Sequence, residues 1–108
     1  MGEGSDMMVK LLMSWDIQEG RDAEYFEFVV REWVPGITKL GLQPTEAWFT
    51  IHGNDTPQVL TGGIAEDMEA MKKIVNSREW ERLHNRLTDF VTNYRQKIVR
   101  ATGTLQLF

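Results

Sequence analysis

The stretch Val9-Lys-Leu-Leu-Met-Ser-Trp-Asp-Ile17 decides the fold, because apolar residues occupy every second position in it. A period of two is typical of a β-strand with one face in a core. The apolar face would carry Val9, Leu11, Met13, Trp15 and Ile17. The other face is mixed, since Leu12 lies among polar neighbours there. We therefore predict a strand with one fully buried face and one partly apolar face.

A helix is predicted from Asp22 to Gly41, because apolar residues recur every three or four positions in this range. Asp22 suits the N-cap of this helix. Pro35 lies inside the pattern and cannot donate a backbone hydrogen bond, so we expect a kink there. Gly41 suits the position that follows a helix C terminus.

Two more helices are predicted in the second half of the chain. Apolar residues at helical spacing indicate a short helix over residues 68–75. Ser77 is a good N-cap for a longer helix, whose apolar positions run from Trp80 through Leu83, Leu87, Phe90, Val91 and Tyr94 to Ile98.

Three further strands are predicted from alternation, over Thr45–His52, Gln58–Ala65 and Thr102–Phe108. The turn residues between the first two of these favour an antiparallel hairpin. Gly62-Gly63 indicates a bulge or a close backbone approach in the second. Ala47, Phe49 and Ile51 are expected to face the core.

The order of these elements is β-α-β-β-α-β, which defines an α+β, ferredoxin-like fold. Right-handed crossovers place both main helices on one face of a four-stranded antiparallel sheet. We expect residues 1–7 to form a flexible leader and residues 8–108 to form one domain.

Composition excludes several classes of function. Twelve Lys and Arg against sixteen Asp and Glu give a net charge of −4, which disfavours nucleic-acid binding. The absence of cysteine removes disulfides and thiolate metal sites. No apolar run approaches the roughly 18 residues of a membrane span, and the N terminus lacks a signal-peptide pattern. We expect a cytoplasmic protein that binds neither nucleic acid nor membrane.

The second face of the sheet predicts how the chain assembles. Its large apolar side chains are Leu12, Trp48, Leu60 and Ile64. Leaving each of them in water would forfeit about 1.5–3 kcal/mol. A contiguous patch of this kind usually marks a partner. We therefore expect a homodimer in which two copies pack their sheets face to face and form a shared barrel.

Two helix signatures resemble those of the dimeric α+β barrel superfamily: Glu32-Trp-Val-Pro-Gly36 and Ser77-Arg-Glu-Trp80. The resemblance covers residues 8–107 together with the order of elements. It implies a group that includes cofactor-free antibiotic-biosynthesis monooxygenases, haem-degrading enzymes, cyclases, isomerases and many uncharacterised members. The helix signatures are most similar to the uncharacterised members.

His52 is the first candidate catalytic residue, because imidazole titrates near neutrality and can act as a general base. Asp16 or Glu46 could orient it. The alternative interpretation is that His52 lies at a strand end and faces solvent or the rim of the dimer.

Trp15, Trp48 and His84 are candidate ligand-binding residues, since aromatic side chains line sites for aromatic molecules. The alternative is that the tryptophans are core residues and that Trp48 anchors the dimer. By the resemblance, His84 could also be an axial haem ligand. The haem-degrading relatives, however, use an asparagine on the first strand, where this chain has Ser14 and Asp16.

No metal or organic cofactor is predicted. The chain lacks the HxH and HExxH patterns of metal sites, and nothing in the spacing requires His52, His84 and a carboxylate to converge.

Three functions follow from these observations. The first is the binding of a small apolar or aromatic molecule between the sheet and the helices. The second is a cofactor-free monooxygenase, or a proton-transfer cyclase or isomerase, of small aromatic or polyketide-like substrates. The third is a purely structural or regulatory dimer. The sequence does not decide whether the chain is an enzyme.

Overall fold

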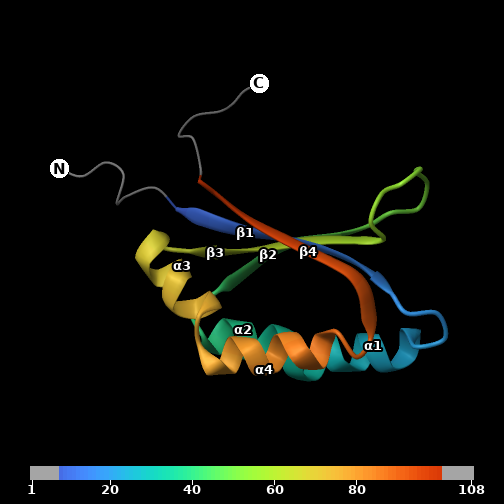
Figure 1. Ribbon diagram of the computed structural model, residues 1–108, viewed down its shortest axis with the longest axis horizontal. Helices are drawn as coiled ribbons and strands as arrows, with labels where there is room; N and C mark the ends of the chain where they lie inside the picture. The colour runs from blue at the N-terminus through green and yellow to red at the C-terminus, as the bar shows by residue number, and fades with distance from the viewer. Residues whose placement is uncertain (1–7, 101–108) are drawn as a thin grey trace.

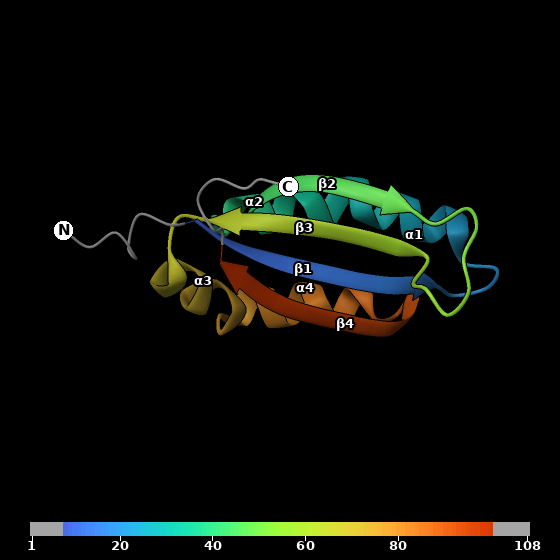
Figure 2. The same ribbon diagram turned by 90° about the horizontal axis from the view of Figure 1, so that it is seen from above.

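A four-stranded antiparallel sheet forms one layer of the molecule, and the helices form a second layer on one of its faces (Figure 1). The computed structural model describes residues 8–100. Its strands are β1 (Val9–Ile17), β2 (Gln43–Phe49), β3 (Val59–Ala65) and β4 (Val91–Arg100). They lie in the order β2-β3-β1-β4, so that β2 and β4 are the edges (Figure 2). The predicted ferredoxin-like fold is confirmed.

The helix layer begins with one continuous rod of three segments: α1 (Asp22–Phe28), a π-helical turn η2 (Val29–Trp33) and α2 (Val34–Lys39). The N–H of Val34 donates to the carbonyl of Val29, which is the five-residue spacing of a π turn. The expected irregularity at Pro35 is therefore a π turn immediately before the proline. Asp22 is the first helical residue, and the N-cap position is Arg21, without a side-chain cap. Gly41 follows the rod with a φ of +100°, as predicted.

Two shorter helices complete the layer: α3 (Met68–Val75) at one end of the sheet and α4 (Arg78–Leu87) beside the rod (Figure 1). Side-chain caps fix both N termini. The Asp67 carboxylate accepts from the N–H of Ala70, and the Ser77 hydroxyl accepts from the N–H of Trp80. The predicted N-cap role of Ser77 is confirmed.

The apolar face of β1 forms the centre of the core, as its alternation predicts. All five odd-numbered side chains from Val9 to Ile17 are buried against residues of the helices and of the neighbouring strands. The largest helical contributors are Tyr25, Phe28, Trp33 and Trp80.

The prediction that Ala47, Phe49 and Ile51 are core residues is wrong. Phe49 pairs with Val59 and so faces the helix layer, but 51% of its surface is exposed. Ile51 follows the end of β2 and is 94% exposed. Because β2 is an edge strand, the helices cover the side chains on its helix-facing side only in part. The core receives Leu42 instead, from the turn before the strand.

The predicted long helix through Ile98 is also wrong, because the chain turns after Leu87 and returns as β4. The register between β1 and β4 shifts beside Asp16, and Asn93 adopts a φ of +57° there. This bulge breaks the alternation of the strand. Core-facing residues then follow one another at helix-like spacings: Val91, Tyr94 and Ile98. The strand predicted over Thr102–Phe108 and the leader predicted over residues 1–7 lie outside the described residues.

The glycine pair in β3 permits a close approach. A Cβ atom on Gly63 would lie 2.6 Å from Cγ of Leu42, and one on Gly62 would lie 2.7 Å from Cε of Lys10. The register between β1 and β3 runs through both glycines without a shift. The register between β2 and β3, by contrast, shifts between Pro44 and Ala47, opposite Gly62. Both interpretations offered by the sequence, a bulge and a close approach, are therefore observed here.

Candidate functional site

A cluster of aromatic rings lies between the sheet and the helices. Its centre is Trp15, whose ring stacks on Tyr94 at a centroid distance of 5.8 Å and an interplanar angle of 9°. Trp33 meets the same indole edge-on at 6.0 Å, and the indole N–H donates to the Tyr25 hydroxyl at 2.9 Å. We call six residues the aromatic cluster: Trp15, Tyr25, Trp33, Trp80, His84 and Tyr94.

Five segments deliver these rings, and local features position three of them. The π turn η2 ends at Trp33 and directs it toward Trp15 and toward Trp80, at 5.6 Å from the latter. The Ser77 cap sets the start of α4, which carries Trp80 and, one turn later, His84. The β4 bulge places Tyr94 on the core side of the sheet.

His84 and Tyr94 form the rim of the cluster. Their rings meet edge-on with centroids 4.4 Å apart, and both residues are half-buried, whereas the other four are buried. Burial lowers the pKa of His84, and burial raises the pKa of the Tyr94 phenol. Both side chains are therefore uncharged at neutral pH. The Tyr94 hydroxyl donates to Oε1 of Gln96 at 2.7 Å.

The ring nitrogens of His84 have no hydrogen-bond partner within residues 8–100. A half-buried, uncharged imidazole of this kind has one donor and one acceptor available. The rim thus combines flat apolar surfaces with a polar group that is free to bind.

Asp16 and His52 do not meet in the described part of the chain. The Asp16 carboxylate accepts from the Asn93 amide at 2.9 Å and from the N–H of Gln58 at 2.8 Å. These two bonds hold the pKa of Asp16 below its usual value, and the bond from Asn93 has the larger effect. His52 lies in the exposed loop after β2, and Glu46 is paired with Lys10 at 2.9 Å. No hydrogen bond between residues 8 and 100 joins His52 to either carboxylate.

Trp48 lies on the opposite face of the sheet from the aromatic cluster. It is 65% exposed and pairs across the strands with Leu60, which pairs with Ser14. These residues line a groove of about 610 Å³, together with Leu12, Glu46, Arg95 and Lys97. The structure therefore joins Trp15 and His84 in one cluster and places Trp48 elsewhere.

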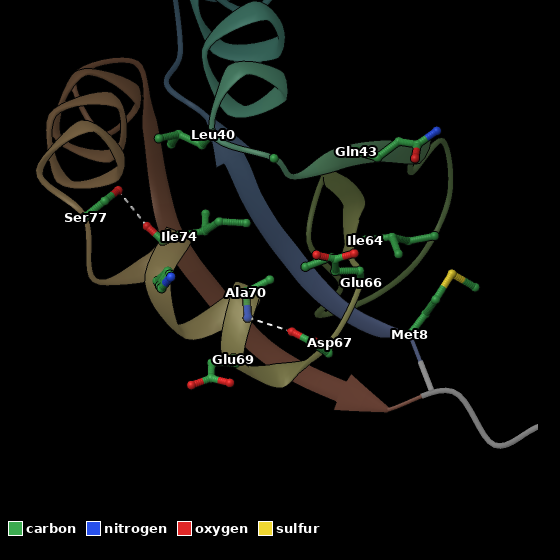
Figure 3. A pocket seen from close by; sticks show the side chains of 13 residues that line it. Met8, Leu40, Gln43, Ile64, Glu66, Asp67, Glu69, Ala70, Ile74 and Ser77 are labelled. Atoms are coloured by element: carbon green, nitrogen blue, oxygen red, sulfur yellow. Dashed lines mark hydrogen bonds between the residues drawn. The ribbon is translucent and has the colours of Figure 1, made fainter. Parts of the chain in front are cut away.

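A second hollow, of about 1100 Å³, lies between α3 and the end of the sheet (Figure 3). It is lined by apolar residues, among them Leu40, Ile64 and Ile74, and by the charged residues Glu66, Asp67, Glu69 and Lys73. The polar groups of Asp67 and Ser77 that border it are already used in hydrogen bonds to the chain, which Figure 3 draws as dashed lines. It presents no aromatic residue.

Residues 8–100 contain no group of three or more potential ligands that could hold a metal ion. Within the same range, no helix is both long and apolar enough to cross a membrane.

Four members of the cluster were not among the site residues predicted from the sequence: Tyr25, Trp33, Trp80 and Tyr94. Tyr94 was predicted to lie in a helix, because the bulge in β4 places the core-facing residues at intervals of three and four positions. Tyr25 extends the helical pattern one turn before Phe28, and this spacing alone would place it on the core face.

Comparison with known proteins gives fold neighbours only. No family model matches the chain, and no curated protein sequence matches it. A DABB family protein with a ferredoxin-like fold from Mesorhizobium loti matches with a TM-score of 0.72 and 9% identity, over 90% of this chain and 99% of that one. An uncharacterized NIPSNAP domain protein from Burkholderia xenovorans gives a TM-score of 0.66 and 14% identity, over 93% and 99%.

A third neighbour has a described activity. SnoaB, a cofactor-independent oxygenase from Streptomyces nogalater, matches in the form of a single-residue mutant, with a TM-score of 0.66 and 14% identity, over 91% of this chain and 96% of that one. At these identities the comparisons establish the fold. The chain has a ferredoxin-like fold, which agrees with the fold implied by the resemblance in the sequence, and its fold neighbours include uncharacterised proteins.

Proposed function

We propose that the protein binds a small, uncharged aromatic molecule between its sheet and its helices, with the aromatic cluster as the wall of the site. The observation that carries this proposal is the edge contact between His84 and Tyr94, the half-buried rim of an otherwise buried set of rings. A flat ligand that separates these two rings would reach Trp15 and Trp80.

The chemistry of the cluster favours an uncharged ligand. Aromatic walls stabilise a planar molecule by offset stacking and edge contacts, each contributing about 0.5–1.5 kcal/mol beyond apolar burial. His84 supplies one donor and one acceptor at the rim. Because burial keeps His84 uncharged near neutral pH, it offers no fixed charge to an ionic ligand.

We further propose a homodimer formed through the open sheet face. The groove lined by Leu12, Trp48 and Leu60 is the support for it, because it leaves large apolar side chains in water. Arg95 and Lys97 border the same groove. A two-fold arrangement would bring this patch against its own copy.

An enzymatic role is the second candidate, and the lowered pKa of His84 favours it. An uncharged imidazole beside a ligand can take a proton from it as a general base. The match to SnoaB, described as an oxygenase without a cofactor, is compatible with chemistry of this type. The pair suggested by the sequence, His52 with Asp16, is less well supported, because the Asp16 carboxylate is already hydrogen-bonded by Asn93 and Gln58. Under the third possibility, a purely structural or regulatory dimer, the cluster binds nothing.

Thermal unfolding in the presence of naphthalene derivatives tests the proposed binding. A ligand that binds only the native state raises the melting temperature, and at a hundredfold excess over Kd it adds about 2.7 kcal/mol of stability. We expect His84→Ala to reduce this shift and Ile51→Ala, at an exposed loop position, to leave it unchanged. If no aromatic probe shifts the unfolding of the wild-type protein, a structural dimer becomes the better explanation.

The enzymatic candidate needs a comparison of two variants. With a phenolic substrate whose turnover is followed by absorbance, loss of turnover in His84→Gln but not in His52→Gln would assign the base to the aromatic cluster. The reverse result would assign it to the exposed loop.

A further inference from the structure

Tyr25 carries a hydroxyl group deep within the aromatic cluster. The residue is 4% exposed, and its oxygen accepts the indole N–H of Trp15 at 2.9 Å. Burial raises the pKa of this phenol, although the bond from Trp15 acts in the opposite direction. The hydroxyl therefore keeps its own proton at neutral pH.

That proton has no acceptor among residues 8–100. The bond with Trp15 uses a lone pair of the oxygen and leaves the O–H free to donate. Buried donors are nearly always paired in folded proteins, and an unpaired one costs about 1–3 kcal/mol. The contrast with Tyr94 is direct, because the hydroxyl of Tyr94 is satisfied by Gln96. An unpaired donor inside a ring of aromatic walls is the feature expected where a ligand supplies the missing acceptor.

We infer that the Tyr25 hydroxyl binds the carbonyl oxygen of a planar aromatic ketone, so that the ligand completes the chain Trp15 N–H to Tyr25 O–H to ligand oxygen. The inference rests on the proposed function and deepens it by naming the chemical class of the ligand. Donation by Trp15 polarises the Tyr25 hydroxyl, which makes it a better donor to the next oxygen in the chain.

The chemistry of the surroundings selects a neutral acceptor over an anion. Within residues 8–100, neither Trp15 nor Tyr25 makes a side-chain hydrogen bond to a charged group. A buried carboxylate would be costly without a paired cation, whereas a ketone needs only one donor and apolar contact around its rings.

The test uses two probes that differ at one position, 1-indanone and indane. Binding to the full-length protein is measured by titration of its ¹⁵N-labelled amide and indole signals in NMR spectra. We expect 1-indanone to bind about tenfold more tightly than indane, which corresponds to about 1.4 kcal/mol. The indole N–H signal of Trp15 should also shift on addition of the ketone and much less on addition of indane.

Tyr25→Phe and Tyr94→Phe provide the matched comparison, because each removes one hydroxyl from the same cluster. Tyr25→Phe should abolish the preference for the ketone, and Tyr94→Phe should retain it, since the Tyr94 proton is already used. If Tyr25→Phe does not fold, the shift of the Trp15 indole signal with 1-indanone but not with indane decides the question, because His84 can also donate to a ketone and the difference in affinity alone does not separate the two donors.

Two failures are distinguishable. Equal binding of both probes to the wild-type protein, or an unchanged preference in folded Tyr25→Phe, overturns the role of Tyr25 and leaves the aromatic binding site in place. If neither 1-indanone, indane nor the naphthalene derivatives bind, the proposed function is overturned and this inference falls with it.

Discussion

Asp16 and Asn93 are joined by a hydrogen bond of 2.9 Å from the amide to the carboxylate, at the point where the register between β1 and β4 shifts. Asn93 has a φ of +57°, a backbone conformation that asparagine tolerates better than most residues. The second oxygen of Asp16 accepts from the N–H of Gln58 at the start of β3. One carboxylate thus links three strands and holds the bulge that turns Tyr94 toward the core.

Asp16→Asn should lower the free energy of unfolding by about 1.5–3 kcal/mol at pH 7, because the amide offers one acceptor oxygen where the carboxylate offers two. The lowered pKa of Asp16 means that its contribution is present above the unfolded value near pH 4 and is lost as the pH falls through the folded pKa. Urea unfolding at pH 7 and pH 3 measures this. The difference between variant and wild type should shrink at pH 3, and a constant difference would argue against the ionised carboxylate as its source.

His84 should make the stability of the protein decline in mild acid. Its pKa is lowered by burial, so the unfolded chain takes up a proton first. The stabilisation is present above about pH 6.5, the ordinary value, and is lost as the pH falls through the folded pKa. His84→Phe should therefore lose less thermal stability than the wild type between pH 7.5 and pH 5.5. His52→Gln is the control. An equal reduction of the loss of thermal stability in this variant would refute the assignment to His84.

Trp48→Lys should convert the proposed dimer into a monomer. The substitution places a charge at the centre of the groove on the open sheet face, where two copies would have to desolvate it. Sedimentation at micromolar concentration should give a wild-type particle of twice 12.5 kDa and a variant of 12.5 kDa. Ile51→Lys, at an exposed position outside the sheet, should remain dimeric. A monomeric wild-type protein would refute the proposed interface.

Gly63→Ala should destabilise the fold by about 1–3 kcal/mol through overpacking, because its Cβ would lie 2.6 Å from Cγ of the fully buried Leu42. Chemical denaturation measures the loss. Shortening the neighbour in the double variant Gly63→Ala/Leu42→Val should recover part of it beyond the sum of the single changes. Strict additivity would show that the two residues do not compete for the same space.

The alternation of β1 and the predicted order of elements led to the ferredoxin-like fold, although β4 occupies residues 91–100, most of which were predicted to be helical. When one side of a strand is packed and its register is regular, the alternation of apolar side chains shows which face is buried, as from Val9 to Ile17. The Ser77 cap and Gly41 are equally local, because each acts through its own backbone position. The α+β architecture therefore follows from the sequence.

The site followed from the sequence only in part. Trp15 and His84 were identified as candidates, but both contact the ring of Tyr94, and the position of Tyr94 depends on the bulge beside Asp16. A bulge changes which side chains face the core without leaving a clear pattern along the chain. For the same reason the residues at 91–98 were predicted to be helical.

The sequence by itself determined which residues are apolar, where the helices begin and how the strands of the core alternate, because these properties depend on neighbours a few positions apart. The tertiary structure alone decided that β2 is an exposed edge strand and that Asn93 and Gln58 donate hydrogen bonds to the Asp16 carboxylate. It also decided that the Tyr25 hydroxyl accepts the indole N–H of Trp15. Each of these relationships joins residues from different elements. The energies that select them arise from packing and desolvation, which exist only once the sheet and the helices have come together.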